Sequence, residues 1–325
     1  MTDAIPEISA ADLLGPEGAA RLAAEAAVVS AAMGSGFMTL SGADAALGFA
    51  PDLRDRLLGW VDLPEAVKRT QWRRKFDPAA PNVYRGAFPL QPGAATWKEG
   101  IDLGPDLVDP GRANPADPLT EPTPAPSEAV APGWRAAAAE YYLGMERLGR
   151  ALVVVLARGL GLPEAETLRL FDGGISTLRI IHYPERPAES LPEDLTLVTV
   201  EGDARMVVGG AHCDNGFVTL LWQDPQGGLQ ARGRDGRWVD VPALDGGLAV
   251  NFGRMLADLS GGRVRATEHR VLGGLRRRVS APFFLEPAVD APVATEDGVR
   301  AYGDLLWERM SAFPEYRGVE RRPAA

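Results

Sequence analysis

The chain of 325 residues has a single cysteine, Cys213, and only three histidines. One cysteine cannot form an intrachain disulfide, which fits a reducing compartment, so we expect a cytoplasmic protein. Lysine and arginine are also few, 34 against 44 acidic residues, and give a formal net charge of −10. Because no basic stripe is present, neither nucleic acid nor an anionic membrane surface is an expected partner.

Long apolar runs are missing as well. No stretch is long enough to span a bilayer, and residues 1–7 lack the basic and apolar regions of a signal peptide. Hydrophobic residues nevertheless make up 46% of the chain, enough for a sizeable core. The length allows one large domain or two, so the organisation has to come from the order of the elements.

Helical patterns dominate the first half of the chain. Helices are expected at 16–33 and 53–63, with a strand at 37–40 between them. The strongest helix is expected at 134–160, where apolar residues repeat every three or four positions and should pack against a sheet. Between these helices, residues 73–133 are rich in proline and glycine. A binding loop and a surface connector are both open readings of that region.

From residue 176 onward the pattern changes to short strands. Asp235-Gly236 is a strong two-residue hairpin signal. Many short antiparallel strands joined by turns indicate a mainly β protein with flanking helices and a double-stranded β-helix, or jelly roll, as its core. A last helix is expected at 298–312. The strands are expected at 176–184, 206–212, 217–223, 229–234, 237–241, 248–252, 264–272 and 277–285.

Two pairs of polar residues in these strands are candidates for binding a metal ion and a carboxylate. His212 and Asp214 share one strand face and can reach one metal ion, with His269 as a candidate third ligand. Two histidines and one carboxylate with open positions opposite suit non-haem Fe(II) and oxygen chemistry. Arg278 and Ser280 also share a face, and a guanidinium beside a hydroxyl suits capture of a carboxylate. An isolated His-x-Asp is a weak signal, but two of only three histidines are used here.

Together these residues resemble the signature of the Fe(II)/2-oxoglutarate-dependent dioxygenases, in the branch similar to isopenicillin N synthase. The resemblance covers about residues 175–287 and is weaker in the N-terminal third. It implies Fe(II), 2-oxoglutarate and O2 as cofactor and co-substrates. The matching motifs are His212-Cys213-Asp214-Asn215-Gly216-Phe217-Val218-Thr219-Leu220-Leu221, Gly228-Leu229-Gln230, Trp238-Val239-Asp240-Val241-Pro242, Val250-Asn251-Phe252-Gly253 and His269-Arg270-Val271.

The same resemblance implies roles for further residues. His212, Asp214 and His269 would hold the iron as catalytic metal ligands, and Arg278, Ser280 and Tyr183 would bind 2-oxoglutarate. Residues 1–170 would form a helical region that contributes to the substrate pocket, packed on an oxygenase core at 171–325. Substrate candidates in that first region, for a small molecule, are Tyr84, Arg85 and Lys98.

Three readings of the function stay open. The first is a dioxygenase that oxidises a C–H bond of a small molecule and releases succinate and CO2. The second is an oxidase of the same fold that, like isopenicillin N synthase, does not use 2-oxoglutarate. The third is a catalytically silent jelly roll that only binds a ligand. Of the residues outside the signature, His182 is expected to serve packing or the surface, and Cys213 to fill space away from the metal face.

Overall fold

The computed structural model describes residues 4–91, 96–187, 190–191, 195–200, 203–295, 298–312, 316 and 319–321. Its contacts divide the chain into two compact units made of interleaved segments. Unit 1 comprises Met1–Gly48, Leu90–Glu99 and Ile181–Pro282, and unit 2 comprises Phe49–Pro89, Gly100–Ile180 and Phe283–Ala325. This grouping differs from the expected division at residue 170, because strand pairing and helix packing join segments that are far apart in the sequence.

The first sheet of unit 1 contains strands from both ends of the sequence. The expected strand near residue 37 forms, and the chain's first strand lies beside it in parallel at the edge of the sheet. The strand at Leu248–Phe252 pairs antiparallel with the strand near residue 37 on one side and with the strand at Val218–Gln223 on the other. The N-terminal segment is therefore part of the same sheet as the signature region. The order of this sheet begins with β1 (Glu7–Ser9), β2 (Phe37–Ser41), β11 (Leu248–Phe252), β8 (Val218–Gln223) and β13 (Arg278–Leu285).

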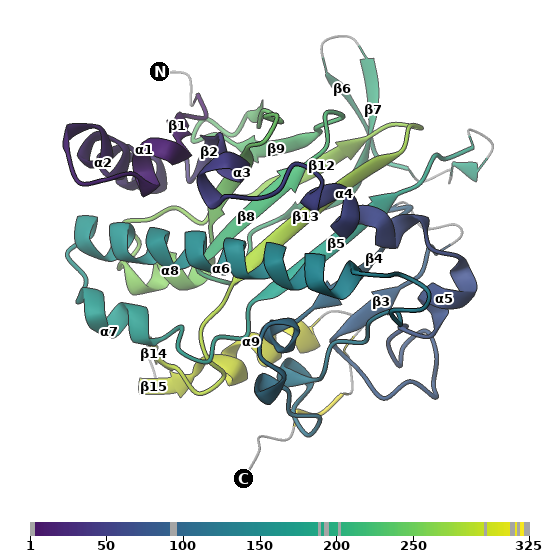
Figure 1. The fold of residues 1–325 in the computed structure, drawn as a ribbon. Helices are drawn as coiled ribbons and strands as arrows, with labels where there is room; N and C mark the ends of the chain where they lie inside the picture. The colour runs from purple at the N-terminus through teal and green to yellow at the C-terminus, as the bar shows by residue number, and fades with distance from the viewer. Residues whose placement is uncertain are drawn as a thin grey trace. The chain divides into compact units, whose positions relative to one another are not determined.

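The second sheet of unit 1 has five strands, in the order β10, β9, β12, β7, β6. A hairpin joins β9 to β10, but its loop is longer than the two-residue turn expected at Asp235-Gly236. The Gly233 N–H donates to the Arg237 carbonyl, and within the loop Gly236 has a positive φ of +81° whereas Asp235 does not. Figure 1 shows β6 and β7 as a hairpin that extends beyond the neighbouring strands of this sheet. The strands are β10 (Trp238–Asp240), β9 (Leu229–Arg232), β12 (His269–Gly273), β7 (Asp203–His212) and β6 (Leu197–Val200).

The core of unit 1 lies between these two sheets. Phe37, Leu221 and Ala249 come from the first sheet and pack with Leu229 and Ala231 of the second. Because each large apolar side chain buried here contributes roughly 1.5–3 kcal/mol, the facing sheets are held by their inward residues. Two sheets, antiparallel apart from the edge strand β1, closed over one core are the predicted jelly roll, which the structure confirms. The helices of unit 1 are α1 (Ala10–Leu14), α2 (Ala19–Met33), α3 (Ala43–Leu47) and α8 (Arg254–Leu259).

Unit 2 is organised around α6 (Trp134–Gly159), the predicted longest helix. Its buried face carries aromatic side chains that bond to neighbouring segments of the unit. The indole of Trp134 donates to the Leu57 carbonyl, and the Tyr142 hydroxyl donates to the Ser176 carbonyl, each over 2.8 Å. Tyr142 also meets the ring of Phe283 edge-on. The amphipathic stripe in the sequence is therefore core, as predicted. The other helices of unit 2 are α4 (Leu53–Leu58), α5 (Glu65–Arg69), α7 (Glu164–Arg169) and α9 (Tyr302–Ser311), of which α4 and α7 pack on α6.

The proline-rich region between residues 73 and 133 is more ordered than its composition indicated. It contains β3 (Gly86–Phe88) and β4 (Glu99–Leu103), and β4 is followed in the sheet order by β5 (Thr177–Tyr183). Asp102 on β4 is fully buried and receives two hydrogen bonds from the Arg179 guanidinium, from Nε at 2.5 Å and from Nη2 at 2.8 Å. Such a paired, buried charge anchors the region within unit 2.

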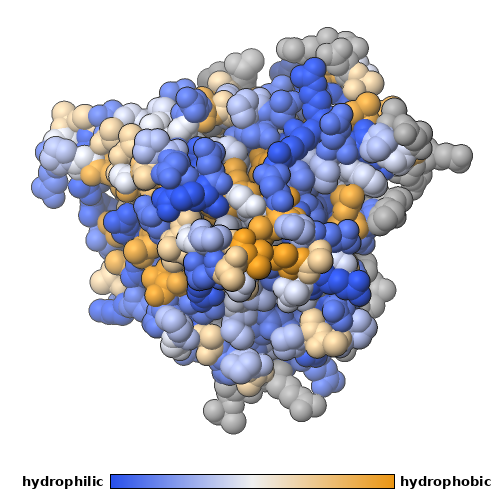
Figure 2. Space-filling view, turned by 45° about the vertical axis from the view of Figure 1, so that its right-hand side comes forward, coloured by the Kyte–Doolittle hydropathy of each residue, from blue (hydrophilic) through white to orange (hydrophobic). Residues whose placement is uncertain are grey.

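Two expected helices differ at their ends. The helix expected at 53–63 changes to a 3-10 turn at Gly59–Asp62, just before Pro64. The one expected at 298–312 begins only at Tyr302, because residues 298–301 pair as β15 with β14 (Pro292–Thr295). No helix among the described residues is long and apolar enough to cross a membrane. Hydrophilic side chains cover most of the face in Figure 2, with small apolar patches between them, as is usual for protein surfaces.

Candidate metal centre and adjoining pocket

His212, Asp214 and His269 come together in unit 1. Asp214 Oδ1 lies 3.7 Å from Nε2 of His212 and 3.6 Å from Nε2 of His269. The two imidazole centroids are 4.4 Å apart. Within the part of the chain that the structure describes, this is the one group of three such side chains that could hold a metal ion, with ligand atoms all within 4.8 Å of one another.

Strand register produces this convergence. His212 ends β7, and His269 begins the neighbouring strand β12 directly opposite it. Residues opposite one another in an antiparallel pair project to the same face, which places both imidazoles on one side of the sheet. Two residues beyond His212 the chain turns, and the Asp214 carbonyl accepts the backbone N–H of Arg254 at the start of α8. This contact holds the backbone of Asp214 at the turn after β7.

Each imidazole is oriented by a backbone carbonyl. Nδ1 of His212 lies 2.8 Å from the Gly210 oxygen, and Nδ1 of His269 lies 3.1 Å from the Thr267 oxygen. Because a carbonyl can only accept, both Nδ1 atoms carry the proton and both Nε2 lone pairs are left for a metal. His269 is buried and meets Phe37 edge-on, whereas the His212 side chain is 54% exposed. The open side of the site is therefore the side of His212.

The Asp214 carboxylate has one occupied and one available oxygen. Oδ2 accepts from the Thr219 hydroxyl at 2.5 Å and from the Asn251 amide at 2.8 Å. Burial alone would raise the pKa of Asp214, but the neighbouring histidines and these two donors outweigh it and lower the pKa. The carboxylate is thus held in its charged form, with Oδ1 directed at the histidines.

These donor atoms fit a ferrous ion. Two nitrogens and one carboxylate oxygen are the donor set of non-haem Fe(II) sites. Ligands about 2.1 Å from a common ion lie about 3 to 3.4 Å apart, so the observed separations of 3.6 and 3.7 Å need only a small adjustment. The locked tautomers and the single free carboxylate oxygen are the arrangement that metal binding requires.

Arg278, Ser280 and Tyr183 also meet in unit 1, as the sequence predicted. Nη1 of Arg278 donates to the Ser280 hydroxyl over 3.1 Å, and Nε donates to the Gly227 carbonyl over 2.7 Å. The Arg278 guanidinium lies 5.1 Å from the centre of the Tyr183 ring. Both Arg278 and Ser280 are buried. A buried guanidinium held in this way is ready to receive a carboxylate.

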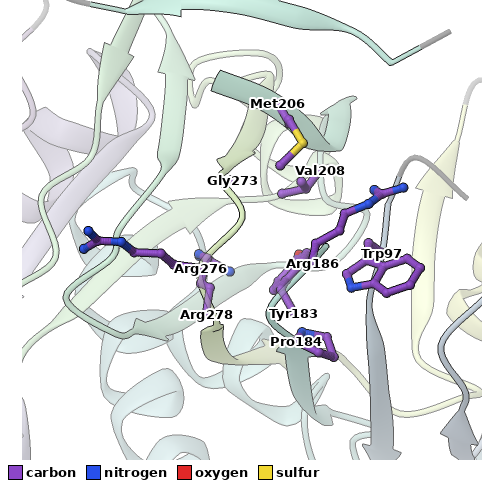
Figure 3. A pocket seen from close by; sticks show the side chains of 10 residues that line it. Trp97, Tyr183, Pro184, Arg186, Met206, Val208, Gly273, Arg276 and Arg278 are labelled. Atoms are coloured by element: carbon purple, nitrogen blue, oxygen red, sulfur yellow. The ribbon is translucent and has the colours of Figure 1, made fainter. Parts of the chain in front are cut away.

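Arg278 and Tyr183 line a pocket within unit 1. Figure 3 shows Met206 and Val208 on one side of it and Tyr183 and Pro184 on the other. Three arginines and no acidic residue are among the lining residues, although the chain carries a net charge of −10. The pocket therefore favours an anion. The lining residues are Trp97, Tyr183, Pro184, Arg186, Met206, Val208, Gly273, Gly274, Arg276 and Arg278.

The three substrate candidates have different surroundings. Arg85 in unit 2 is completely buried, and its guanidinium donates to the carbonyls of Leu103 and Ile175 and to the hydroxyl of Thr177. Tyr84 is also buried, and burial raises its pKa to about 12. The hydrogen bonds of Arg85 and the burial of Tyr84 indicate structural roles for both residues inside unit 2.

Lys98 in unit 1 is half-buried, and its charge contributes to lowering the pKa of His212, after burial and His269. Of the three substrate candidates, Lys98 is therefore the one whose charge acts on a residue of the metal group.

His182 and Cys213 take the roles expected of them. Nδ1 of His182 lies 2.8 Å from the Glu99 carboxylate, and the ring is buried away from the metal triad. The Cys213 thiol is half-buried and directed at the Ala266 carbonyl, 3.4 Å away. Neither side chain belongs to the metal group.

Thr219 and Asn251 are the site residues that sequence reasoning missed. Both stand within matched motifs, but a motif does not show which strands become neighbours. Thr219 is opposite Asn251 in the β8–β11 pair, so a hydroxyl and an amide facing one another on adjacent buried strands was the available signal.

Comparison with known proteins shows a similarity that includes these residues. Residues 174–287 match the model of the 2OG-Fe(II) oxygenase superfamily. This segment is similar to members of that superfamily. All three residues of the metal group, together with Arg278, Ser280 and Tyr183, lie inside the matched segment.

Two curated proteins are similar in sequence to this chain over different lengths. A 2-oxoglutarate-Fe(II) type oxidoreductase of Aspergillus fumigatus is 33% identical over 213 residues, which cover 60% of this chain. The match spans 56% of the length of that relative. Isopenicillin N synthase of Streptomyces clavuligerus is 26% identical over 328 residues, which cover 95% of each chain.

Solved structures support the fold over nearly the whole chain. A full-length Neurospora crassa protein, solved in complex with alpha-KG and thymine, matches with a TM-score of 0.75 at 22% identity. The match covers 95% of this chain and 96% of that one. The shared fold therefore includes the N-terminal segment and not only the superfamily region.

Proposed function

We propose that the protein is an Fe(II)- and 2-oxoglutarate-dependent dioxygenase that oxidises a C–H bond of a small molecule. The observation that carries the proposal is the His212–Asp214–His269 group with both Nε2 atoms and one carboxylate oxygen available. The buried Arg278–Ser280 pair in the same unit supports the choice of co-substrate.

The roles of the chain's residues follow from these contacts. His212, Asp214 and His269 would bind the iron, which when bound supplies the redox chemistry with O2 and 2-oxoglutarate. Thr219 and Asn251 keep the carboxylate in place and charged. Arg278, with Ser280 and Tyr183 beside it, would bind the distal carboxylate of 2-oxoglutarate, and the buried setting excludes water from that ion pair.

The proposal is tested by the fate of the co-substrate. Purified protein with Fe(II) should convert 2-oxoglutarate to succinate and CO2, even slowly without a prime substrate. Arg278→Ala should raise the 2-oxoglutarate concentration needed for half-maximal turnover by about 10- to 150-fold, since hydrogen bonds to a charged group are lost. No succinate from the Fe(II)-loaded wild type in a screen of small-molecule substrates would contradict the proposal.

One alternative has a specific observation in its favour. Isopenicillin N synthase is similar over 95% of both chains, whereas the first curated relative named for 2-oxoglutarate covers 60% of this one. The alternative is an oxidase that takes all its electrons from the substrate. Oxygen uptake that is independent of 2-oxoglutarate would favour this second function.

The remaining features are proposals of the same kind. Structural relatives were solved with small molecules such as thymine and 5-formyluracil, and we propose a small-molecule prime substrate here too, near Lys98. Neither nucleic acid nor membrane is proposed as a partner. The single half-buried cysteine fits a reducing compartment, so we propose a cytoplasmic location, which imaging of a tagged protein would test.

A further inference from the structure

The turn between β8 and β9 holds the Arg278 side chain by its backbone. The Gly227 carbonyl in this turn accepts the Arg278 Nε–H over 2.7 Å, and the Ser280 hydroxyl accepts an N–H of Nη1 over 3.1 Å. These two bonds use two of the five N–H groups of the guanidinium and leave three for a ligand. Arg278 itself is only 4% exposed. The place of the Gly227 oxygen therefore decides which edge of the guanidinium can face a ligand.

Asp224 fixes the shape of this turn. Its Oδ1 accepts the backbone N–H of Gln226 over 3.0 Å, and its backbone carbonyl accepts the N–H of Gly227, also over 3.0 Å. The first of these bonds is that of an Asx turn, in which the short side chain hydrogen-bonds to the backbone two residues on. The residue whose carbonyl meets Arg278 is thus placed by two bonds that Asp224 makes or supports.

Asp224 also ties the turn to the strand that carries Arg278. Its Oδ2 accepts the backbone N–H of Val279 over 2.6 Å, and its own N–H donates to the Val279 carbonyl over 3.1 Å. Val279 directly follows Arg278 on β13. With its two carboxylate oxygens, one side chain therefore joins the turn that presents the acceptor to the strand that presents the donor.

Strand β12 closes the turn from the other side. The Gly228 carbonyl accepts the backbone N–H of Leu272 over 2.7 Å, and a Cβ on Gly228 would collide with the Leu272 carbonyl oxygen. Gly228 also has a φ of +91°, so glycine is needed for this close approach. The turn is thus attached to β12 as well as to β13, and it offers Arg278 a fixed acceptor.

We infer that Asp224 is a positioning residue for Arg278: its carboxylate sets the turn, and the turn sets the direction of the guanidinium before a ligand binds. Immobilising one long side chain on binding costs about threefold to tenfold in affinity, a loss that a side chain already held in place avoids. The class of ligand, a keto acid with a distal carboxylate, rests on the proposed function. The link from Asp224 to Arg278 rests on the hydrogen bonds alone.

The first test needs neither metal nor ligand. In NMR spectra of the metal-free protein, the Arg278 Nε–H signal is identified by its absence from Arg278→Lys. Because this proton is buried and hydrogen-bonded, we expect slow exchange with solvent, and about tenfold faster exchange in Asp224→Ala, the size of one hydrogen bond's contribution. Asp235→Ala is the matched control. Asp235 Oδ1 accepts the Arg237 N–H over 2.9 Å in another turn of unit 1, so its loss should leave the Arg278 signal unchanged.

The second test compares two keto acids of the same chain length. Protein loaded with Mn(II) is titrated by calorimetry with 2-oxoglutarate and with 2-oxopentanoate, which has a methyl group in place of the distal carboxylate. Asp224→Ala should raise the dissociation constant of 2-oxoglutarate about threefold to tenfold, and should leave those of 2-oxopentanoate and Mn(II) within about twofold. In the Arg278→Ala background, Asp224→Ala should have no further effect, because the side chain that it positions is gone.

Asp224→Asn keeps the test available should Asp224→Ala fold poorly. It retains the volume of the side chain and one of its two acceptor oxygens, so only one of the two backbone N–H groups keeps its partner. We expect a smaller loss of 2-oxoglutarate affinity than in Asp224→Ala, again without an effect on 2-oxopentanoate. Thermal unfolding of each variant checks that the fold is retained.

The outcomes separate the two proposals. Equal weakening of both keto acids by Asp224→Ala, or a further loss in the Arg278→Ala background, would overturn the inference, because Asp224 would then act on the fold at large. Exchange of the Arg278 Nε–H that stays as slow in Asp224→Ala as in the wild type would overturn it as well. Wild-type protein that binds Mn(II) but not 2-oxoglutarate would instead contradict the dioxygenase proposal, and the exchange measurement would still decide the role of Asp224.

Discussion

The Thr219 hydroxyl offers a sharp test of how the metal site is held. Thr219→Val replaces the hydroxyl by a methyl group of similar size and removes the 2.5 Å hydrogen bond to Asp214 Oδ2. The Asn251 amide still donates to the same oxygen over 2.8 Å, so the carboxylate keeps one of its two supports. We therefore expect metal affinity to fall by about tenfold, the lower end of the usual 10- to 100-fold effect of such partners, or about 1.4 kcal/mol.

The double variant with Asn251→Leu extends the test. It leaves Oδ2 of Asp214 without either donor, and we expect the loss to reach about 100-fold. Because both donors bind one oxygen, their effects should be coupled and not simply additive. Anaerobic calorimetry with Mn(II) measures the dissociation constants, and thermal unfolding of the metal-free proteins checks that the fold is retained.

Thr199→Val is the matched control. Thr199 is an exposed residue of β6 in the same unit, so the identical chemical change there should leave Mn(II) binding unaltered. If Thr219→Val bound Mn(II) as tightly as the wild type, within twofold, the carboxylate would not depend on this hydroxyl. The orientation assigned to Asp214 would then be refuted.

Three further results are expected. His212→Ala should weaken Mn(II) binding by more than about 100-fold and abolish turnover, and iron-dependent turnover that survives the change would remove His212 from the ligand set. Protein stripped by a chelator should regain succinate formation with Fe(II) but not with Zn(II), which cannot change oxidation state; succinate formation restored by Zn(II) would contradict a redox role for the metal. Acid should destabilise unit 2 through Asp102. Burial alone would raise its pKa, but Arg179, Arg73 and Arg85 together lower it. A lowered pKa contributes stability that is present above the unfolded value of about 3.9 and is lost as the pH falls through the folded value. Asp102→Asn should therefore unfold more easily at pH 7 and show a flatter loss of stability below about pH 5 in chemical denaturation, and an unchanged slope would contradict this assignment.

The sequence indicated which candidate residues come together, because these residues follow local rules. The spacing of His212 and Asp214 places both at one strand end, and Arg278 and Ser280 share a face by the same period of two. The rest of the site depends on which strands become neighbours. Thr219 and Asn251 meet only because β8 pairs with β11, a register that no local pattern specifies.

The fold was predictable where amphipathic periodicity was strong, and less so where tertiary contacts decide. The long helix α6 and the strands of the jelly roll formed as expected. The strands β3 and β4 were missed because the surrounding prolines and glycines mask their short patterns. The division at residue 170 could not anticipate that Leu90–Glu99 groups with unit 1 while Phe283–Ala325 groups with unit 2.

The turn at Gly36 has a consequence for how much of the chain the metal group depends on. Gly36 has a φ of +70°, and any larger residue there would collide with Thr267. The Thr267 hydroxyl donates to the Ser35 carbonyl, and the Thr267 carbonyl oxygen lies within hydrogen-bond distance of His269 Nδ1. Phe37 packs edge-on against the His269 ring. A recombinant fragment limited to the matched residues 174–287 would thus lose the contacts of Ser35 and Phe37 that support His269 and its neighbour Thr267.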